Sequence, residues 1–197
     1  METDVGNLSK GNLYRRNLLK QFCVFLIIIS LRKGTVGYMI FVTLGSQKFQ
    51  FNRLLKALDE FAGEGKIKED ILAQSGYSDY SPIHYKCKSF LDREEFRLLE
   101  HKAEIIITHG GTGAIIGAVK NGKKVIAVPR LAKYGEHVDD HQLQIITQFA
   151  EMNLIEACMD CSKLVQYLEK VRVTNYSQYV SNTETYIEKI EEFIKVL

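Results

Sequence analysis

Short apolar segments with strand-like composition alternate with amphipathic segments along most of this chain, and this alternation restricts its fold more than any other feature. Residues 38–44, Tyr-Met-Ile-Phe-Val-Thr-Leu, are rich in β-branched and aromatic side chains and end at Gly45 and Ser46. Such a run is typical of a strand that is buried on both faces. From Phe51 to Phe61 apolar residues then recur every three or four positions, which predicts an amphipathic helix.

The same alternation predicts the rest of the fold. Further strands are predicted at Asp70–Ala73, Lys86–Phe90, Ala103–Thr108, Lys124–Val128 and Leu154–Ala157. Further helices are predicted after Asp92, from the turn at 109–113 to about Lys120, around Leu143–Phe149, at Leu164–Val171 and at Thr183–Val196. We therefore expect an α/β, Rossmann-like parallel sheet with right-handed crossovers and helices on both faces. Ligands of such sheets bind beyond the carboxyl ends of the strands.

Composition excludes several classes of protein. The chain has 197 residues, of which 46% are hydrophobic and 25% charged, and it contains no apolar run of about 18 residues that could span a bilayer as a helix. Residues 1–38 hold six basic and two acidic residues, so the remainder is slightly acidic despite the net charge of +2. This balance argues against nucleic-acid binding through a broad basic face. Four cysteines do not form a disulfide framework, and reduced thiols in a cytoplasmic setting are expected.

Residues 1–38 are predicted to be an N-terminal extension of a domain that spans residues 39–197. The apolar run Phe22–Ile29 resembles a signal sequence, but it is short, basic residues follow it at once, and it lacks a small-x-small cleavage site. Two interpretations stay open. In the first, the extension is extraneous and Met39 is the functional start, because residues 32–34 can be encoded by a purine-rich run like a bacterial ribosome-binding site. In the second, the apolar run contacts an anionic membrane surface.

Two strand-to-helix turns, at residues 43–47 and 108–114, are rich in glycine and hydroxyl residues. The second turn places Gly110, Gly111 and Gly113 at the start of a helix, where residues without a Cβ let the backbone approach a ligand and free amides attract an anion. Thr112 adds a hydroxyl donor, and the ring of His109 can hydrogen-bond or carry a charge near phosphate. We predict a diphosphate site here. The alternative is that the glycines only let strand and helix pack closely.

The ligand class is narrowed by motifs that the sequence lacks. It contains no Gly-x4-Gly-Lys-Ser/Thr motif, which excludes a P-loop. The strand at 124–128 ends in Pro129 and Arg130 and lacks the acidic residue that would bind the ribose of NAD, which argues against an NAD-binding site. Cys158 and Cys161 have the spacing of zinc and redox sites, but without a second pair they predict only a loop before the next helix.

A third polar cluster, His-Val-Asp-Asp-His-Gln at residues 137–142, opens a helix after a strand end. Its side chains can point toward the hydroxyl groups of a ligand. The alternatives are helix capping by Asp139 or Asp140, and a metal site formed by His137, Asp140 and His141. We assign no metal, because no further ligand set with zinc-like spacing accompanies the cluster.

Taken in order, these segments resemble the C-terminal, donor-binding domain of family 28 glycosyltransferases of the GT-B class. The resemblance runs from Met39 to about Lys170 and rests on the strand before Gly45, the segment Ile106–Gly113, the strand ending at Pro129, and His141 with Gln142 before a helix. It is greatest to one-domain catalytic subunits, namely that of the dolichol-linked N-acetylglucosaminyl transferase and its bacterial counterparts in capsule and exopolysaccharide synthesis. It implies a single GT-B half.

The resemblance also assigns residues to the site. It implies that the turn at 109–113 holds the diphosphate of a UDP-sugar, that Gln142 contacts sugar hydroxyls, and that the segment around Phe90 lies near the uracil. The donor-binding residues expected in this way are Gly45, Ser46, Phe90, His109, Gly110, Gly111, Thr112, Gly113, His141 and Gln142. Two positions depart from relatives: Gly117 replaces a glutamate that binds ribose, and His141 replaces an aspartate.

The activity implied by the resemblance is inverting transfer of a hexose from UDP-galactose or UDP-N-acetylglucosamine to a lipid-linked saccharide acceptor. No metal and no cofactor are expected; His109 is the expected catalytic residue, and it would stabilise the departing UDP together with the helix-start amides. The general base is unassigned. A membrane-anchored subunit would supply the acceptor half and dock on the last helix through Ile187, Ile190 and Ile194, holding the chain at the inner face of the membrane. The alternatives are a non-catalytic UDP-sugar-binding module and a sugar-nucleotide epimerase.

Overall fold

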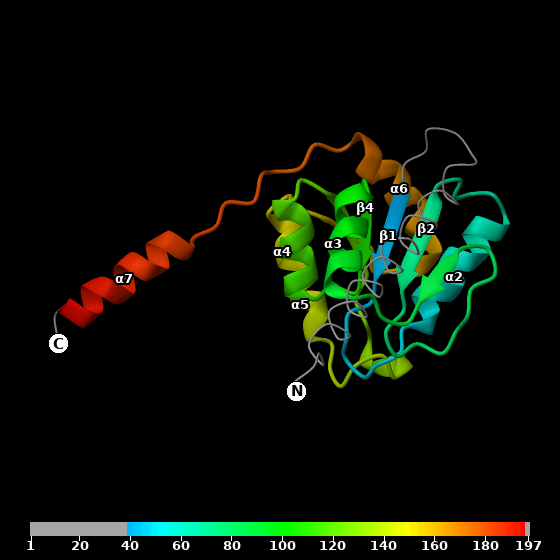
Figure 1. The fold of residues 1–197 in the computed structure, drawn as a ribbon, viewed down its shortest axis with the longest axis horizontal. Coiled ribbons are helices and arrows are strands. Elements are labelled where there is room, and N and C mark those ends of the chain that lie inside the picture. Colours follow the sequence, from blue (N-terminus) through cyan, green and yellow to red (C-terminus); the bar gives the residue numbers. More distant parts are fainter. Residues whose placement is uncertain (1–38, 196–197) are drawn as a thin grey trace, which may run out of the picture.

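The computed structural model describes residues 39–195, which form one parallel sheet between two layers of helices (Figure 1). The strands are β1 (Met39–Thr43), β2 (Asp70–Gln74), β3 (Lys86–Lys88), β4 (Ile105–Thr108), β5 (Lys124–Ala127) and β6 (Glu156–Ala157). They pair in the order β3-β2-β1-β4-β5-β6. This confirms the predicted Rossmann-like fold. The predictions for residues 1–38, including the run Phe22–Ile29, lie outside the described residues.

The side chains of the central strands alternate between two cores, because successive residues of a strand point to opposite faces. Ile40 and Val42 pack in the core under α2 (Asn52–Gly63) and α6 (Leu164–Val173). Phe41 packs in the core on the other face. That face is covered by α3 (Arg93–Lys102), α4 (Thr112–Lys120) and α5 (His141–Glu151) (Figure 1). A strand buried on both faces needs a continuous apolar sequence, which explains the apolar run at residues 38–44.

Most strands are shorter than their apolar runs predicted. The strand predicted at residues 38–44 occupies only Met39–Thr43, because Gly45 turns the chain at a φ of 72°. The strand predicted from Lys86 to Phe90 ends at Lys88. Leu154 does not belong to β6, since its N–H donates to the carbonyl of Phe149 at the end of α5. Strand ends depend on hydrogen-bonding partners on the neighbouring strand, which hydropathy does not specify.

The strand order reverses its direction between β1 and β4. The chain moves from β1 outward to β3 and then crosses back to place β4 on the other side of β1. We call this point of reversal the switch point; ligands of open α/β sheets bind there, outside the carboxyl ends of the strands. Thr43 and Thr108, the last residues of the two strands, are partners in the sheet. The β1 turn (residues 43–47) and the β4 turn (residues 108–114) therefore lie next to each other at the switch point.

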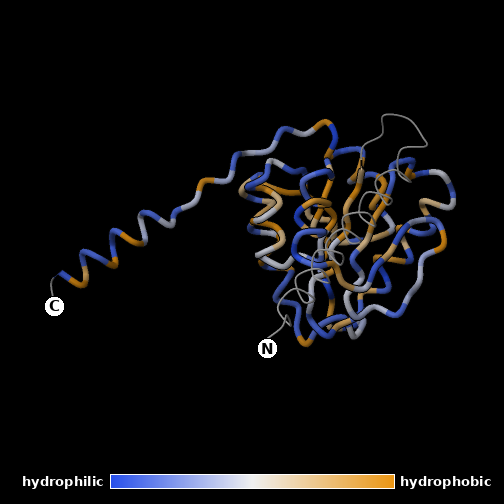
Figure 2. Tube along the Cα trace, viewed as in Figure 1, coloured by the Kyte–Doolittle hydropathy of each residue, from blue (hydrophilic) through white to orange (hydrophobic). Residues whose placement is uncertain are grey.

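The last helix, α7 (Thr183–Lys195), stands away from the sheet at the end of an extended segment (Figure 1). Figure 2 shows apolar residues recurring along α7. These large side chains are 50% to 67% exposed, and they are Tyr186, Ile187, Ile190, Phe193 and Ile194. Within residues 39–195, no helix is both long and apolar enough to cross a membrane.

Candidate functional site

His109 lies at the switch point, with its ring packed between glycines of the β1 turn and the β4 turn. A Cβ built on Gly45 would lie 2.6 Å from Cε1 of the ring, and a Cβ built on Gly111 would lie 2.6 Å from Nε2. Both positions therefore need glycine to leave room for the ring, in addition to any ligand. Gly110 serves packing instead: its φ is 86°, and a Cβ there would meet Cδ1 of Ile146 at 2.3 Å. The packing alternative thus holds for Gly110.

The start of α4 is open to a ligand. Its N-cap residue, Gly111, makes no side-chain capping bond, and its first turn contains no acidic residue. Thr112 and Gly113 are exposed, and nothing lies within 4 Å of a Cβ built on Gly113. The amides of the first helical turn have no partner within the helix and carry the positive end of its dipole. This arrangement suits the binding of an anion such as a diphosphate.

The electrostatic environment of His109 keeps its ring neutral at pH 7. The residue is 8% exposed, and burial together with the charge of Arg130 lowers its pKa to about 4. Nδ1 lies 3.4 Å from the carbonyl oxygen of Thr43. A carbonyl only accepts hydrogen bonds, so this contact favours the proton on Nδ1 and a lone pair on Nε2. Of the two roles that the sequence left open for the ring, the geometry favours hydrogen bonding over a positive charge.

Gln142 and His141 begin α5, but they occupy different environments. Gln142 is buried, and its Oε1 accepts a hydrogen bond from the backbone N–H of Arg130 at 3.0 Å. This bond turns the oxygen toward the backbone of Arg130, and it leaves the second lone pair of the oxygen and the amide nitrogen for a contact with sugar hydroxyls. His141 is exposed, and its backbone N–H donates to Oδ1 of Asp139 at 3.0 Å. Asp139 thus contributes to the helix start, as one alternative predicted.

The other predicted donor-binding residues lie around the same edge of the sheet. Phe90 follows β3, is 49% exposed and packs edge-on against Tyr77, with ring centroids 5.2 Å apart. Ser46 is exposed in the β1 turn. The pair formed by Phe90 and Tyr77 presents accessible aromatic surface beyond the strand ends, where a nucleobase could stack. The structure thus places Phe90 at the edge that carries the two turns.

The metal alternative finds no geometric support at residues 137–141. Nδ1 of His137 lies 3.1 Å from Oδ1 of Asp139, and Oδ1 of Asp140 accepts the N–H of Ala132 at 2.8 Å. Within residues 39–195, no three His, Cys, Asp or Glu side chains gather in a group that could hold a metal ion. The cluster instead fixes the loop that leads into α5.

Gly117, where the resemblance expected a glutamate, faces a carboxylate of α3. A Cβ built on Gly117 would lie 3.4 Å from Oε1 of Glu100, whose Oε2 accepts a hydrogen bond from Nδ2 of Asn121. Burial raises the pKa of Glu100. A glutamate in place of Gly117 would therefore meet a second carboxylate, which gives a structural reason for the small residue here.

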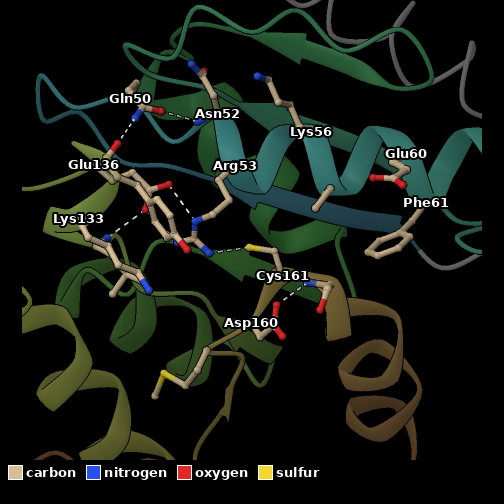
Figure 3. Close-up of a pocket in the computed structure, with 15 residues that line it drawn as sticks. Gln50, Asn52, Arg53, Lys56, Glu60, Phe61, Lys133, Glu136, Asp160 and Cys161 are labelled. Atoms are coloured by element: carbon tan, nitrogen blue, oxygen red, sulfur yellow. Dashed lines mark hydrogen bonds and ion pairs between the residues drawn. The ribbon is translucent and has the colours of Figure 1, made fainter.

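A pocket of about 1010 Å³ lies beside the switch point, and none of the predicted donor-binding residues line it. Its wall is formed by α2, the loop after β5 and the short helix η2 (Cys161–Lys163) (Figure 3). Arg53 on α2 binds Glu136 through two hydrogen bonds, Nε to Oε1 at 3.0 Å and Nη2 to Oε2 at 2.9 Å. The carboxylate of Glu136 is buried, and the bidentate geometry makes this a strong pair.

The two cysteines of the CxxC segment belong to the same wall. Sγ of Cys161 lies 3.0 Å from Nη1 of Arg53, and Sγ of Cys158 donates to the carbonyl of Asp160 at 3.2 Å. Burial raises the pKa of Cys158 to about 12 and that of Cys161 to about 11, so both thiols are protonated at pH 7. A protonated thiol is a poor nucleophile and metal ligand. As predicted, the segment forms the connection before α6.

Three charged residues at this edge of the sheet were not selected from the sequence: Arg53, Arg130 and Glu136. Arg130 is 0% exposed, and Glu136 is also fully buried. The available signal was the position of Arg130, directly after a buried strand at the ligand edge. Arginine and glutamate are mostly exposed in proteins, and the sequence pattern does not indicate which of them are buried.

A family model described as glycosyltransferase family 28 C-terminal domain matches residues 39–197. The crystal structure of CalG4, the calicheamicin glycosyltransferase, is 17% identical with a TM-score of 0.54 and covers 73% of this chain and 36% of that chain. The kitacinnamycin glycotransferase is 13% identical with a TM-score of 0.53 and the same coverage of each chain.

A solution structure of ALG13 is 17% identical with a TM-score of 0.49, and it covers 78% of this chain and 94% of that chain. The chain spans little more than a third, 36%, of the length of CalG4 and of the kitacinnamycin enzyme. At these identities the similarity to CalG4 and to the kitacinnamycin enzyme shows a shared fold. A search of curated proteins found no match.

Proposed function

The chain belongs to the family of glycosyltransferase family 28 C-terminal domains, and from this membership we propose that it binds the diphosphate of a UDP-sugar at the switch point. One observation carries the proposal. The uncapped start of α4 lies beside the β1 turn at the reversal of strand order, with Thr112 and Gly113 exposed and no acidic residue in the first helical turn. Helix-start amides at such a position bind phosphate groups without a metal ion.

The remaining donor contacts follow from the placement of the side chains. Phe90 and Tyr77 would stack on the uracil, Ser46 would hydrogen-bond to the diphosphate, and the amide nitrogen of Gln142 would reach the sugar hydroxyls. We favour UDP-galactose or UDP-N-acetylglucosamine as donor. No cofactor is invoked, because the UDP-sugar is itself the substrate.

The proposed reaction is transfer with inversion at the anomeric carbon. An acceptor hydroxyl forms the new carbon–oxygen bond on one face of the sugar, while the bond to the β-phosphate oxygen breaks on the other. The bonding electron pair leaves with the phosphate oxygen, and the hydroxyl proton passes to a base that is not assigned. The amides of α4 stabilise the charge that develops on the leaving UDP. His109 contributes as a neutral hydrogen-bonding ring that positions the two turns.

We propose that the acceptor is a lipid-linked saccharide held by a membrane-anchored subunit, in capsule or exopolysaccharide synthesis. The support is the exposed apolar side of α7, which includes Ile187, Ile190 and Ile194. A helix of this kind gains stability by docking its apolar side on another protein. Docking would hold the chain at the cytoplasmic face of the membrane as a peripheral subunit of a heterodimer.

The test is sugar transfer in the presence of the partner. The chain is co-expressed with a membrane protein encoded next to it, and transfer of radiolabelled sugar from each UDP-sugar to lipid-linked acceptor is measured. We expect transfer from one donor, and we expect the His109→Ala variant to lose UDP affinity or turnover because the turns lose their shared contact. His101→Ala, which changes an exposed histidine of α3, is the matched control.

Each other outcome selects a different function. UDP binding without transfer to any acceptor would favour the non-catalytic UDP-sugar-binding module. Interconversion of UDP-sugars without lipid would favour the epimerase. If calorimetry detects no binding of UDP, the assignment of the switch point as a donor site is wrong.

A further inference from the structure

Arg130 connects the end of β5 to the β1 turn through a fully buried side chain. It follows Pro129 directly and is 0% exposed. Its Nη2 donates hydrogen bonds to the carbonyl oxygens of Leu44, at 2.7 Å, and Phe49, at 3.1 Å. These two carbonyls lie on either side of the segment that contains Gly45 and Ser46. One guanidinium nitrogen thus connects Leu44 in the β1 turn to Phe49, two residues beyond the turn.

The backbone around Arg130 is fixed on three sides. Its own N–H donates to Oε1 of Gln142. The carbonyl of Pro129 accepts a hydrogen bond from Nη2 of Arg53 at 2.9 Å, and the N–H of Leu131 donates to Oε2 of Glu136 at 3.0 Å. The backbone that carries Arg130 is therefore fixed, so its guanidinium is less mobile than that of an arginine on the surface.

Among the described residues, the guanidinium of Arg130 forms no hydrogen bond with a carboxylate, and Glu136 acts on it only through its charge. Both oxygens of Glu136 are occupied by Arg53, and Oε2 also accepts the N–H of Leu131. Among residues 39–195, Nε and Nη1 of Arg130 find no hydrogen-bond partner. Burial lowers the pKa of Arg130 to about 10, so the group is still charged at pH 7. Glu136 pairs with Arg53, whose side chain is 22% exposed, so the three residues together carry one net positive charge at this edge of the sheet.

A buried charge without a hydrogen-bonded counter-ion is unfavourable, and an apolar side chain of similar volume would fill the same space at lower cost. The charge is close enough to His109 to act on its ring. An anion bound between the β1 turn and the β4 turn would supply the missing negative charge. The neutral ring of His109 and the uncapped start of α4 add no competing carboxylate.

We propose that Arg130 is a positioning residue for the donor diphosphate. Its guanidinium fixes the β1 turn through the carbonyl of Leu44, and it supplies a buried positive charge that the bound diphosphate neutralises. The inference rests on the proposed donor site and adds to it a residue specific for the phosphate groups. The side chain of Arg130 is not assigned to the base or the sugar, because its guanidinium contacts run to the carbonyls of Leu44 and Phe49, and only its backbone N–H contacts the side chain of Gln142.

The test compares uridine, UMP and UDP as ligands of the full chain. Affinities are measured by NMR titration or calorimetry for the wild type, Arg130→Met, Arg130→Lys and the matched control Arg97→Met, which removes an exposed arginine from α3. We expect Arg130→Met to lose about 10- to 100-fold in affinity for UDP, the loss typical of a charge-assisted interaction, and less than about twofold for uridine. Arg130→Lys keeps the charge and should recover part of the loss, while Arg97→Met should bind like the wild type.

The outcomes separate this inference from the proposed function. If the wild type binds UDP and Arg130→Met binds it equally well, the role of Arg130 is wrong and the donor site stands. If Arg130→Met loses uridine and UDP affinity in the same proportion, Arg130 has a merely structural role and the inference is overturned. If the wild type binds neither UMP nor UDP, the donor site itself is wrong. Should Arg130→Met fail to fold, Arg130→Gln makes the same comparison, because its neutral amide can still donate to Leu44.

Discussion

At the residue scale, packing decides the chemical state of His109. Burial of its ring against Gly45 and Gly111 disfavours the protonated form, and Arg130 adds a repulsive positive charge. A histidine in that position is a neutral group at physiological pH. Its ring can therefore fix the geometry of the two turns, while the positive potential for an anion comes from the start of α4 and from Arg130.

This neutrality predicts how stability depends on pH. The pKa of His109 is about 4 in the folded chain and about 6.5 in the unfolded chain, so between these values the unfolded state takes up a proton that the folded state does not. The stabilisation is fully present above pH 6.5 and is lost as the pH falls toward 4, to an extent of roughly 2–4 kcal/mol. Urea unfolding of the wild type and of His109→Gln at pH 7.5, 5.5 and 4.5 measures this loss of stability.

The difference between the two proteins isolates His109, since other titrating groups contribute to both. The wild type should lose more stability than His109→Gln over this range. Parallel pH profiles would show that the ring is protonated in the folded state or already neutral in the unfolded one.

At the scale of elements, the loop between β5 and α5 is held by one buried ion pair. Glu136 binds Arg53 on α2 and the N–H of Leu131. Because Arg53 also donates to the carbonyl of Pro129, this pair braces the backbone on both sides of Arg130. The loop thus connects α2, β5 and α5 at the ligand edge of the sheet.

We expect Glu136→Gln to destabilise the fold by about 3–5 kcal/mol, because it removes the buried carboxylate that pairs with Arg53. Urea unfolding at pH 7.5 gives the change in free energy. The matched control is Glu95→Gln, which removes a partly exposed pair with Lys88 and should cost less than about 1 kcal/mol. Equal effects of the two substitutions would mean that the buried pair adds nothing beyond a surface pair.

At the scale of the whole molecule, the described chain consists of a closed sheet-and-helix body and a helix that does not contribute to it. All residues of α7 are exposed, whereas both cores of the body are complete without it. The body thus contains the proposed donor site, and α7 offers the proposed docking surface for the membrane subunit.

Removal of residues 181–197 should therefore leave the body intact. We expect the free energy of unfolding to change by less than about 0.5 kcal/mol, as for surface changes in general, and the affinity for UDP to stay the same. Transfer to lipid-linked acceptor in the co-expressed complex should be lost. Thermal unfolding, calorimetry and the transfer assay measure the three quantities, and a marked drop in stability would show that α7 packs on the body.

The sequence by itself determined the fold class and predicted the place of the proposed site. Both follow from local patterns: the alternation of buried strands with amphipathic helices specifies a parallel sheet, and the glycines at 110, 111 and 113 mark the helix start at its ligand edge. The sequence also located Phe90 and Gln142 near that edge. These predictions needed only periodicity and the order of segments.

Only the tertiary structure decided the charges of the site. The contact between Arg130 and Leu44 joins residues 86 positions apart, and the pair of Arg53 with Glu136 joins residues 83 positions apart. Spacing along the chain cannot show which arginine takes the carboxylate and which stays without one. The neutral state of His109 likewise depends on burial by segments from across the sheet, because the free energy of a charge is set by all of its neighbours in space.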